Sequence, residues 1–327
     1  MIDFGVAIVG CGGLGATHAR CIAEIDGLRT IAYCDLDQAR ADAMATEFGG
    51  YGTTEFDRIL ADDAVKIIYL TTQHDSHADL CCRALAAGKH VMVEKPLAMT
   101  LEQCLQVREA AAASSAMLMV AFKMRYYELL AKARELISDP LMITMQLMDV
   151  RWGDQLWVND PVRGGGNVLA QGCHATDLIR FLAGRDPIEV YAAGGNFYQA
   201  TGVVDNLSAV FRFDGDVAGN WIQGDCDTPQ VTSKFFLQLF AEGRAVTLTD
   251  RLTTLVYTEG GQEKLRLRGT ESGFHEESRD LLRALREEAP SPVDVTDGLY
   301  ATVMALQAMA STRSHRPEPI RDVIAGR

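Results

Sequence analysis

A cluster of glycines close to the start of the chain is the feature that most constrains its fold. The hexapeptide G-C-G-G-L-G at residues 10–15 follows an apolar run at 6–9 and precedes a helix-compatible stretch at 14–25. In such a strand–loop–helix unit the glycines allow a tight turn, a close approach of the backbone to a pyrophosphate, and close helix–strand packing. The phosphates bind at the helix N-terminus, where free N–H groups and the helix dipole favour an anion.

An ordinary glycine-rich turn is the alternative interpretation of this hexapeptide. Because strand, loop and helix are all in place, we predict a dinucleotide-binding site instead. The expected cofactor contacts in this loop are Gly10, Gly12, Gly13, Leu14 and Gly15.

Apolar runs and helical patterns alternate over about the first 120 residues. Strands are predicted at 6–9, 28–34, 65–70, 90–93 and 117–122, and helices at 14–25, 37–48, 77–87 and 100–113. Continuous apolar strands separated by helices indicate a parallel sheet that is covered on both faces. We therefore predict a Rossmann-type, doubly wound α/β domain over residues 1–122.

The pattern changes after residue 123. Helices are predicted at 127–137, 167–183, 274–288 and 297–312, an irregular loop at 150–166, and several strands within 189–267. Consecutive strands without helices between them suggest a mostly antiparallel sheet. Residues 123–327 are thus predicted to form an α+β domain with a large open sheet that binds substrate and mediates oligomerisation.

Composition narrows the possible partners and the compartment. The formal net charge of −13 argues against nucleic acid or an anionic membrane surface as the main partner. No transmembrane span is evident, and the first ten residues carry Asp3 without a basic segment, so we expect no signal peptide. The 8 cysteines form no C-x-x-C pair, which favours a reducing cytoplasm.

Asp35 ends the second predicted strand, twenty residues after Gly15. A carboxylate there can accept hydrogen bonds from ribose hydroxyls and repels a 2′-phosphate. The next three residues supply no cation, and the nearest is Arg40. We therefore expect NAD in preference to NADP. The alternative role for Asp35 is a helix N-cap, for which Asp37 is the better candidate.

A charged pair follows the strand at 90–93, where Glu94 and Lys95 precede Pro96. In an open α/β sheet the carboxyl ends of the strands face the ligand crevice. A lysine beside bound nicotinamide can hold a substrate hydroxyl and tune its proton transfer, and the proline ends the strand. The alternative is a surface ion pair between Lys95 and Glu94.

Three segments taken together carry a family resemblance: G-C-G-G-L-G, A-G-K-H-V-M-V-E-K-P-L-A and G-G-G-N-V-L-A-Q-G-C-H-A-T-D-L. In order and spacing they resemble the glucose–fructose oxidoreductase, inositol dehydrogenase and rhizopine-catabolism (Gfo/Idh/MocA) family. The resemblance implies NAD(P)-dependent hydride transfer to or from a sugar, an inositol-like cyclic polyol or a related alicyclic alcohol. It also implies homodimers or homotetramers formed through the C-terminal sheet, a catalytic Lys95, and a cis peptide bond before Pro96.

The family's second catalytic element is an aspartate four residues before a histidine. The histidine matches His174, but Ala170 occupies the aspartate position. On one continuous helix Ala170, His174 and Asp177 would form a stripe. We expect His174 to accept the substrate hydroxyl proton. Asp177 could compensate for the missing acid, although a structural partnership with an arginine or a backbone group is the stronger expectation.

The resemblance also implies cofactor contacts beyond the glycine loop. Thr71 and Thr72 follow the strand at 65–70, His77 matches a family histidine, and Glu94 and Lys95 lie in the E-K-P motif. A metal site at His74, Asp75 and His77 is the alternative for this segment, but no further ligand motif accompanies it, so we expect no metal.

Substrate contacts are expected mainly from the second half of the chain. Arg125 and Tyr126 occupy the place of the family's R-F or R-Y dipeptide, and Gln171 lies in the same segment as His174. Trp152 and Trp157 could stack on a substrate ring, with ordinary packing as the alternative.

Three functional hypotheses remain open. The leading one is an NAD-dependent dehydrogenase of the alcohols named above. The second is a redox-neutral glycosidase or lyase that uses tightly held NAD for transient oxidation. The third is a non-catalytic NAD-binding regulator, which the substitution at Ala170 favours and the intact E-K-P motif opposes.

Overall fold

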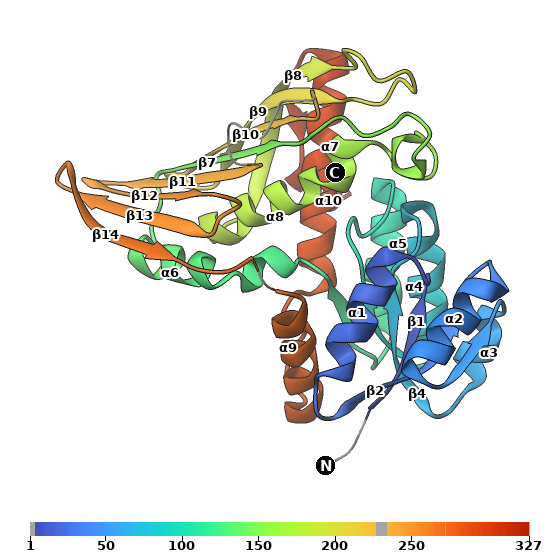
Figure 1. Ribbon diagram of the computed structural model, residues 1–327. Coiled ribbons are helices and arrows are strands. Elements are labelled where there is room, and N and C mark those ends of the chain that lie inside the picture. Colours follow the sequence, from blue (N-terminus) through green and yellow to red (C-terminus); the bar gives the residue numbers. More distant parts are fainter. Residues whose placement is uncertain (1–3, 227–233, 272, 327) are drawn as a thin grey trace. The chain divides into compact units, whose positions relative to one another are not determined.

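A computed structural model of the protein describes residues 4–226, 234–271 and 273–326 (Figure 1). Asp3, which was used to argue against a signal peptide, lies outside these residues. The chain divides into two compact units. The first unit comprises the described residues up to Ala98, together with Glu102–Lys123 and Phe274–Leu299, and the second unit comprises the others.

The first unit is built on a parallel sheet of six described strands in the order β3-β2-β1-β4-β5-β6. Its strands are β1 (Phe4–Val9), β2 (Leu28–Cys34), β3 (Tyr51–Thr53), β4 (Val65–Leu70), β5 (His90–Val93) and β6 (Leu118–Val120). The central strands β1 and β4 are almost wholly apolar and buried, because helices cover both faces of such a sheet. This confirms the predicted doubly wound α/β fold.

The helices of this unit connect successive strands or return to the sheet from the far end of the chain (Figure 1). They are α1 (Gly13–Ala23), α2 (Gln38–Phe48), α3 (Phe56–Ala61), α4 (His77–Ala86), α5 (Leu101–Ala113) and α9 (Phe274–Glu287), with a 3₁₀ turn η1 (His74–Ser76). Asp37 caps α2, since its carboxylate accepts the Ala39 amide hydrogen bond at 2.9 Å. The N-cap role expected for Asp37 is therefore observed.

Two short elements and one long-range return were not predicted from the sequence. Strand β3 and helix α3 lie in a stretch too short for a clear periodic pattern. The segment Phe274–Leu299 belongs to the first unit, although the predicted boundary placed it in the second. The physical reason is that α9 packs against α1 and buries an apolar stripe there.

The second unit contains nine described strands in one sheet, in the order β14-β13-β12-β11-β7-β10-β9-β8-β15. Its strands are β7 (Met142–Met148), β8 (Pro187–Gly195), β9 (Asn206–Phe213), β10 (Ala218–Gly224), β11 (Phe235–Ala241), β12 (Arg244–Thr249), β13 (Thr254–Glu259), β14 (Gln262–Arg268) and β15 (Glu318–Pro319). All described pairs are antiparallel except β7 with β10. The prediction of a mostly antiparallel sheet is confirmed, although β7 itself was not predicted.

Helices α8 and α6 lie against this sheet, α8 on β7 and β10 and α6 on β12 and β13. The helical elements are η2 (Lys123–Tyr126), α6 (Glu128–Leu136), η3 (Trp157–Asn159), α7 (Asn167–Ala170), α8 (Gly172–Ala183), α10 (Val295–Ser314) and α11 (Arg321–Ile324), of which η2 and α10 begin in the first unit. Apolar side chains on the sheet remain exposed at Tyr191, Val210, Ile222, Met142 and Phe240. No helix in the described ranges is long and apolar enough to cross a membrane.

One predicted helix is divided in the structure. Residues 167–183 form α7 and α8, which are separated at Gln171. Helix α8 begins at Gly172 against the buried Trp221 ring, which lies within 2.3 Å of a Cβ built on Gly172. Of the predicted stripe, His174 and Asp177 share α8, whereas Ala170 ends the preceding helix α7.

Candidate active site

The glycine loop leaves β1 at the carboxyl end of the parallel sheet. Gly10 has a φ of 97°, and a Cβ on it would lie 2.6 Å from the Thr71 carbonyl oxygen. A Cβ on Gly15 would lie 2.1 Å from the Gly10 carbonyl oxygen, so α1 can approach the loop only with glycine there. Nothing described lies within 4 Å of a Cβ built on Gly12 or Gly13, so the outer side of the loop is open.

Helix α1 begins directly above this open side. Gly12 is its N-cap and supplies no side-chain hydrogen bond, so the first backbone N–H groups of the helix point outward without a side-chain cap. The Leu14 side chain is partly exposed beside them. An open backbone cradle at a helix N-terminus fits a pyrophosphate, so these residues suit the dinucleotide predicted from the sequence.

Asp35 follows β2 and is oriented by two backbone donors. One carboxylate oxygen accepts from the Cys11 amide at 2.8 Å and the other from the Asp37 amide at 3.0 Å. A carboxylate has further acceptor positions, so it can still receive ribose hydroxyls. Nε of Arg40, the nearest cation in sequence, lies 3.6 Å from Oδ2 of Asp37. The arrangement therefore presents a negative charge at this position.

Leu36 was not considered as a candidate site residue in the sequence. Its side chain is 99% exposed, immediately after Asp35. An exposed leucine beside an acid that can bind ribose offers an apolar surface to an adenine ring. The available signal was a single apolar residue in an otherwise polar turn between strand and helix.

Thr71 and Thr72 directly follow β4, and His77 begins α4. The Thr71 hydroxyl donates to the Gly10 carbonyl oxygen at 2.7 Å and thereby joins this turn to the glycine loop. His77 is fully buried, with its two ring nitrogens 2.8 Å and 3.3 Å from the carbonyl oxygens of Pro96 and Thr72. Burial lowers the pKa of His77. His77 therefore connects the β4 turn with the E-K-P turn.

The E-K-P turn follows β5, and the peptide bond between Lys95 and Pro96 is cis, as the family resemblance implied. Glu94 is buried beneath the turn. One of its oxygens lies 2.9 Å from Nε2 of His18, and the other accepts from the Lys95 amide at 3.3 Å. Burial opposes ionisation of Glu94, but His18 and the Lys95 charge outweigh it, so the pKa of Glu94 falls below its ordinary value.

The surface ion pair considered for Glu94 and Lys95 does not describe this arrangement, because the Glu94 carboxylate points into the protein. His18 was missed by the sequence analysis. Its only local signal was a polar residue on the buried face of α1.

In the second unit, Asp177 on α8 is committed to Arg125. Both carboxylate oxygens accept from Nε at 3.1 Å and 2.9 Å, and one also accepts from Nη2 at 2.5 Å. The two side chains are 2% and 8% exposed, and the guanidinium also lies 4.8 Å from the Phe181 ring centroid. Asp177 is therefore the structural partner of an arginine, as the sequence analysis favoured, and does not replace the missing family acid.

His174 lies on the first turn of α8 and is buried, with Gln171 at the break just before the helix. Ala170 is also buried and ends α7. Tyr126 lies in η2, immediately after Arg125. These predicted substrate residues all belong to the second unit, whereas Lys95 and the predicted cofactor residues belong to the first.

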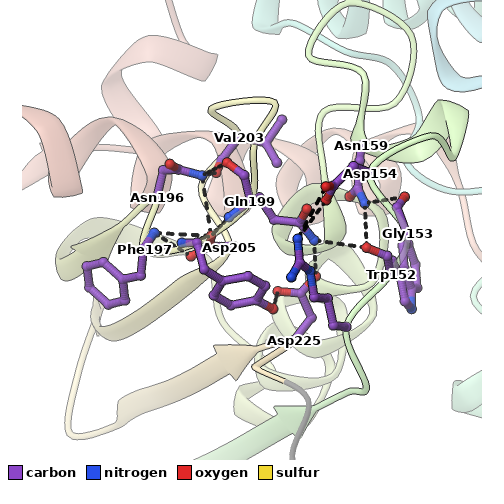
Figure 2. Close-up of polar contacts among 12 residues, drawn as sticks. Trp152, Gly153, Asp154, Asn159, Asn196, Phe197, Gln199, Val203, Asp205 and Asp225 are labelled. Atoms are coloured by element: carbon purple, nitrogen blue, oxygen red, sulfur yellow. Dashed lines mark hydrogen bonds and ion pairs between the residues drawn. The ribbon is translucent and has the colours of Figure 1, made fainter.

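The loop that carries Trp152 and Trp157 is anchored by side-chain amides (Figure 2). The Trp152 carbonyl oxygen accepts from Asn159 and from Gln199, each at 3.2 Å. Gln199 also donates to the buried Asp225 at 3.0 Å. Burial raises the pKa of Asp225 above its ordinary value. The loop is therefore an ordered part of the second unit, and the side chain of Trp157 is partly exposed on it.

Comparison with known proteins gives two matches that follow one another along the chain. The oxidoreductase family with an NAD-binding Rossmann fold, GFO_IDH_MocA, matches residues 4–122. The GFO/IDH/MocA C-terminal domain matches residues 131–231. The chain belongs to this family. The predicted family and the prediction of an NAD(P)-dependent oxidoreductase acting on alcohol groups are thereby confirmed.

Members of the Gfo/Idh/MocA family with named activities are moderately similar to this chain in sequence. A D-xylose 1-dehydrogenase (NADP(+)) from Haloferax volcanii is 29% identical over 68% of this chain and 70% of its own length. An inositol 2-dehydrogenase from Rhizobium meliloti is 29% identical over 57% of this chain, and the match spans only 56% of that enzyme.

A solved structure of the same fold covers nearly the whole chain. The aldose-aldose oxidoreductase from Caulobacter crescentus, complexed with glycerol, superposes with a TM-score of 0.87 at 20% identity. The match covers 97% of this chain and 99% of that one. At this identity the likeness supports the fold of both units of this Gfo/Idh/MocA protein.

Proposed function

We propose that the protein is an NAD-dependent dehydrogenase that transfers hydride between the cofactor and a sugar, an inositol-like cyclic polyol or a related alicyclic alcohol. The observation that carries this proposal is the E-K-P turn, where Glu94 is anchored in the interior and Lys95 follows it at the carboxyl end of β5. The same unit contains the open cradle at Gly12 and the oriented carboxylate of Asp35. Hydride chemistry requires a cofactor site and a polar group for the reacting oxygen on one rigid scaffold.

Each unit is assigned one part of the chemistry. Bound NAD would supply the hydride acceptor for alcohol oxidation. The Lys95 ammonium would hold the reacting hydroxyl oxygen and stabilise negative charge that develops on it. His174 would take the hydroxyl proton through its imidazole and then release it to solvent. In the direction of reduction the same groups return the proton to the carbonyl oxygen.

NAD is the proposed cofactor, rather than NADP. Both carboxylate oxygens of Asp35 are oriented by backbone amides, and its charge would repel a 2′-phosphate. The arginine nearest in sequence, Arg40, lies beside Asp37, which offsets its charge. Thr71, Thr72 and His77 would support the cofactor by holding the neighbouring turns in place.

In the second unit the proposed substrate contacts are Tyr126, Trp152, Trp157, Gln171 and His174, and in the first unit the proposed substrate contact is Lys95. Arg125, which the sequence also suggested as a substrate contact, would act through Asp177, because its Nε and Nη2 donate to that carboxylate. Relatives that are named for D-xylose and inositol oxidation support a polyhydroxylated or alicyclic substrate.

We further propose a homodimer or homotetramer formed through the sheet of the second unit. Tyr191, Val210 and Ile222 are exposed on three neighbouring strands of that sheet. A row of exposed apolar side chains is typical of a protein interface. None of the eight cysteines forms a disulfide in the described residues, which fits a reducing cytoplasm, the proposed compartment.

The test is an absorbance assay for NADH formation with NAD and a panel of inositols, aldoses, sugar acids and alicyclic diols. We expect turnover with one chemical group and a loss of about a hundredfold or more in the Lys95→Ala variant. Parallel reactions with NADP test the cofactor preference. Turnover that survives Lys95→Ala would contradict the assigned role of the lysine.

Two other functions would give different results in this assay. A redox-neutral glycosidase or lyase would retain NAD through purification and consume substrate without net NADH formation. A non-catalytic regulator would bind NAD but turn over nothing, an outcome that the absence of an acid at Ala170 would then explain.

A further inference from the structure

The segment that follows β8 in the second unit is held by a buried carboxylate (Figure 2). Asp205 is fully buried and accepts from the backbone amides of Phe197, Tyr198 and Gln199 at 2.9 Å, 3.0 Å and 2.9 Å. Burial opposes ionisation of Asp205, but these three hydrogen bonds outweigh it, so the pKa of Asp205 falls below its ordinary value. The backbone of residues 197–199 is therefore fixed on a carboxylate.

A second buried carboxylate, Asp225, fixes two side chains of the same segment. Asp225 directly follows β10 and is fully buried. Its Oδ1 accepts from the Tyr198 hydroxyl at 2.5 Å, and its Oδ2 accepts from Nε2 of Gln199 at 3.0 Å. The backbone and the side-chain amide of Gln199 are thus held by two different aspartates.

The acceptors around Gln199 decide how its side-chain amide is oriented. Besides Asp225, Nε2 of Gln199 donates to the Trp152 carbonyl oxygen at 3.2 Å. A carbonyl oxygen and an ionised carboxylate can only accept, so both contacts require the NH₂ end of the amide. The other end, Oε1, is buried without a hydrogen-bond partner among the described residues. Leaving an acceptor buried in this way costs free energy, which the contacts with Trp152 and Asp225 must outweigh.

The Trp152 carbonyl is where this arrangement meets the loop 150–166. Its other described donor is Nδ2 of Asn159, which also donates to the Gly153 carbonyl oxygen at 3.1 Å. Asn159 belongs to the loop itself, whereas Gln199 lies outside the loop and is joined to the end of β10 through Asp225. Gln199 therefore ties the loop to the sheet of the second unit.

We propose that Gln199 is a positioning residue for substrate binding. By holding the Trp152 carbonyl it fixes the backbone from which the Trp152 side chain extends, and Asp225 acts on Trp152 through Gln199. The inference rests on the substrate contacts proposed for Trp152 and Trp157. Losing a contact that binds substrate and transition state equally raises KM and leaves kcat unchanged. The KM for NAD should also stay unchanged, because the proposed cofactor contacts belong to the first unit.

Substitutions at both ends of the Gln199–Asp225 contact test this role by steady-state kinetics with the substrate that the panel identifies. Gln199→Leu removes the donor to Trp152, so the substrate KM should rise about tenfold, the size expected for one net hydrogen bond. Asp225→Ala should raise KM similarly, because Gln199 loses an acceptor that orients it. Gln262→Leu is the matched control, since it makes the same change in the same unit at an exposed side chain on β14.

A conservative variant and a double mutant separate positioning from general damage to the fold. Asp225→Asn can accept from Gln199 and donate to the Tyr198 oxygen, so its KM should stay near that of the wild type. Gln199→Leu combined with Asp225→Ala should raise KM no more than Gln199→Leu alone, because Asp225 acts through Gln199. Urea unfolding shows whether each variant is folded. Gln199→Asn, an amide too short to span both acceptors, replaces Gln199→Leu if the leucine variant does not fold.

Hydrogen exchange of the loop amides gives a readout that does not depend on activity. Backbone amides within 153–164 donate inside the loop, as the Asn159 amide does to the Leu156 carbonyl oxygen at 2.9 Å. We expect faster exchange over this segment in Gln199→Leu and Asp225→Ala, because freeing the Trp152 carbonyl lowers the local free energy of opening. Asp225→Asn and the control variant should exchange like the wild type.

The outcomes distinguish this inference from the proposed function. Unchanged loop exchange in Gln199→Leu overturns the inference even if Lys95→Ala abolishes activity. Faster exchange with an unchanged substrate KM, or with a fall in kcat as large as the rise in KM, also overturns it. The expected exchange and KM together with an active Lys95→Ala variant overturn the role of the lysine instead.

Discussion

Each unit buries one carboxylate close to a proposed catalytic side chain, and the two carboxylates have different partners. Glu94 in the first unit contacts His18, whose charge and tautomer depend on its surroundings. Asp177 in the second unit contacts Arg125, whose guanidinium stays charged at any ordinary pH. Both carboxylates are almost inaccessible to solvent.

The comparison suggests a division of roles. A permanent, three-bond ion pair is suited to fixing the start of α8, on which His174 lies. A carboxylate held by an imidazole and one backbone amide can respond to protonation, and it lies directly before Lys95. We expect the contact between Asp177 and Arg125 to matter chiefly for folding. We expect the contact between Glu94 and His18 to matter chiefly for the pH dependence of the protein.

The largest expected effect is at the fixed ion pair. Asp177→Ala would leave the Arg125 guanidinium buried without its carboxylate and should cost about 3–5 kcal/mol in free energy of unfolding. Urea denaturation measures this loss. Asp186→Ala is the control, because its partnership with Arg180 is 44% exposed on the aspartate side and should contribute at most about 1 kcal/mol. Equal losses in the two variants would refute the assignment of Asp177 as a buried structural group.

The next largest effect is expected at His174, which lies on α8 together with Asp177 and is proposed to accept the substrate proton. His174→Asn should lower kcat by about a hundredfold with little change in stability, since an asparagine cannot take the substrate proton. Steady-state kinetics with the substrate identified in the panel provide the measurement. His315→Asn is the control at an exposed histidine. If both variants retain full activity, His174 is not the base, and restoring the family acid with Ala170→Asp should then have no effect on kcat.

Glu94→Gln tests the responsive carboxylate. The folded-state pKa of Glu94 is below its ordinary value of 4.5, so ionised Glu94 stabilises the fold above that pH, and the contribution is lost as the pH falls through the lowered pKa. At neutral pH the substitution should cost about 1.5–3 kcal/mol, the range for hydrogen bonds to charged groups. Urea unfolding should show the gap from the wild type closing in strong acid. A gap independent of pH would be the contrary result.

Asp35 is a third carboxylate, which is held by neutral amide donors and remains partly accessible to solvent. Asp35→Ser removes the charge that opposes a 2′-phosphate, so the ratio of kcat/KM for NAD over NADP should fall about tenfold. Asp37→Ser is the matched control, because serine preserves the N-cap of α2. A ratio that changes equally in both variants would mean that Asp35 does not select the cofactor.

Local patterns predicted much of the first unit. Apolar runs located β2, β4 and β5 at their observed bounds, and the glycine loop was recognised from its spacing. Each of these features depends on residues adjacent in the chain. Strand β7 had an alternating pattern of Ile143, Met145 and Leu147 that was overlooked, whereas the short β3 offered no pattern long enough to recognise.

Such local patterns did not predict contacts between segments that are distant in the sequence. The first residue of α8, Gly172, packs closely against Trp221, some fifty residues further along the chain. The return of α9 to the first unit brings the Phe274 ring against His18, although the two are separated by most of the sequence. Neither residue belongs to a motif that singles it out.

Spacing along one strand, loop or helix was enough to predict the Rossmann-type unit and the family, and to single out Lys95, His174 and Asp35 as candidates, because such spacing is a local property. Which charges meet depends on the tertiary structure. It joined Asp177 to Arg125 and Glu94 to His18, and it left Glu277 buried without a partner among the described residues. Ionic and hydrogen-bonding partners are chosen by proximity in space, and a linear pattern does not encode that proximity.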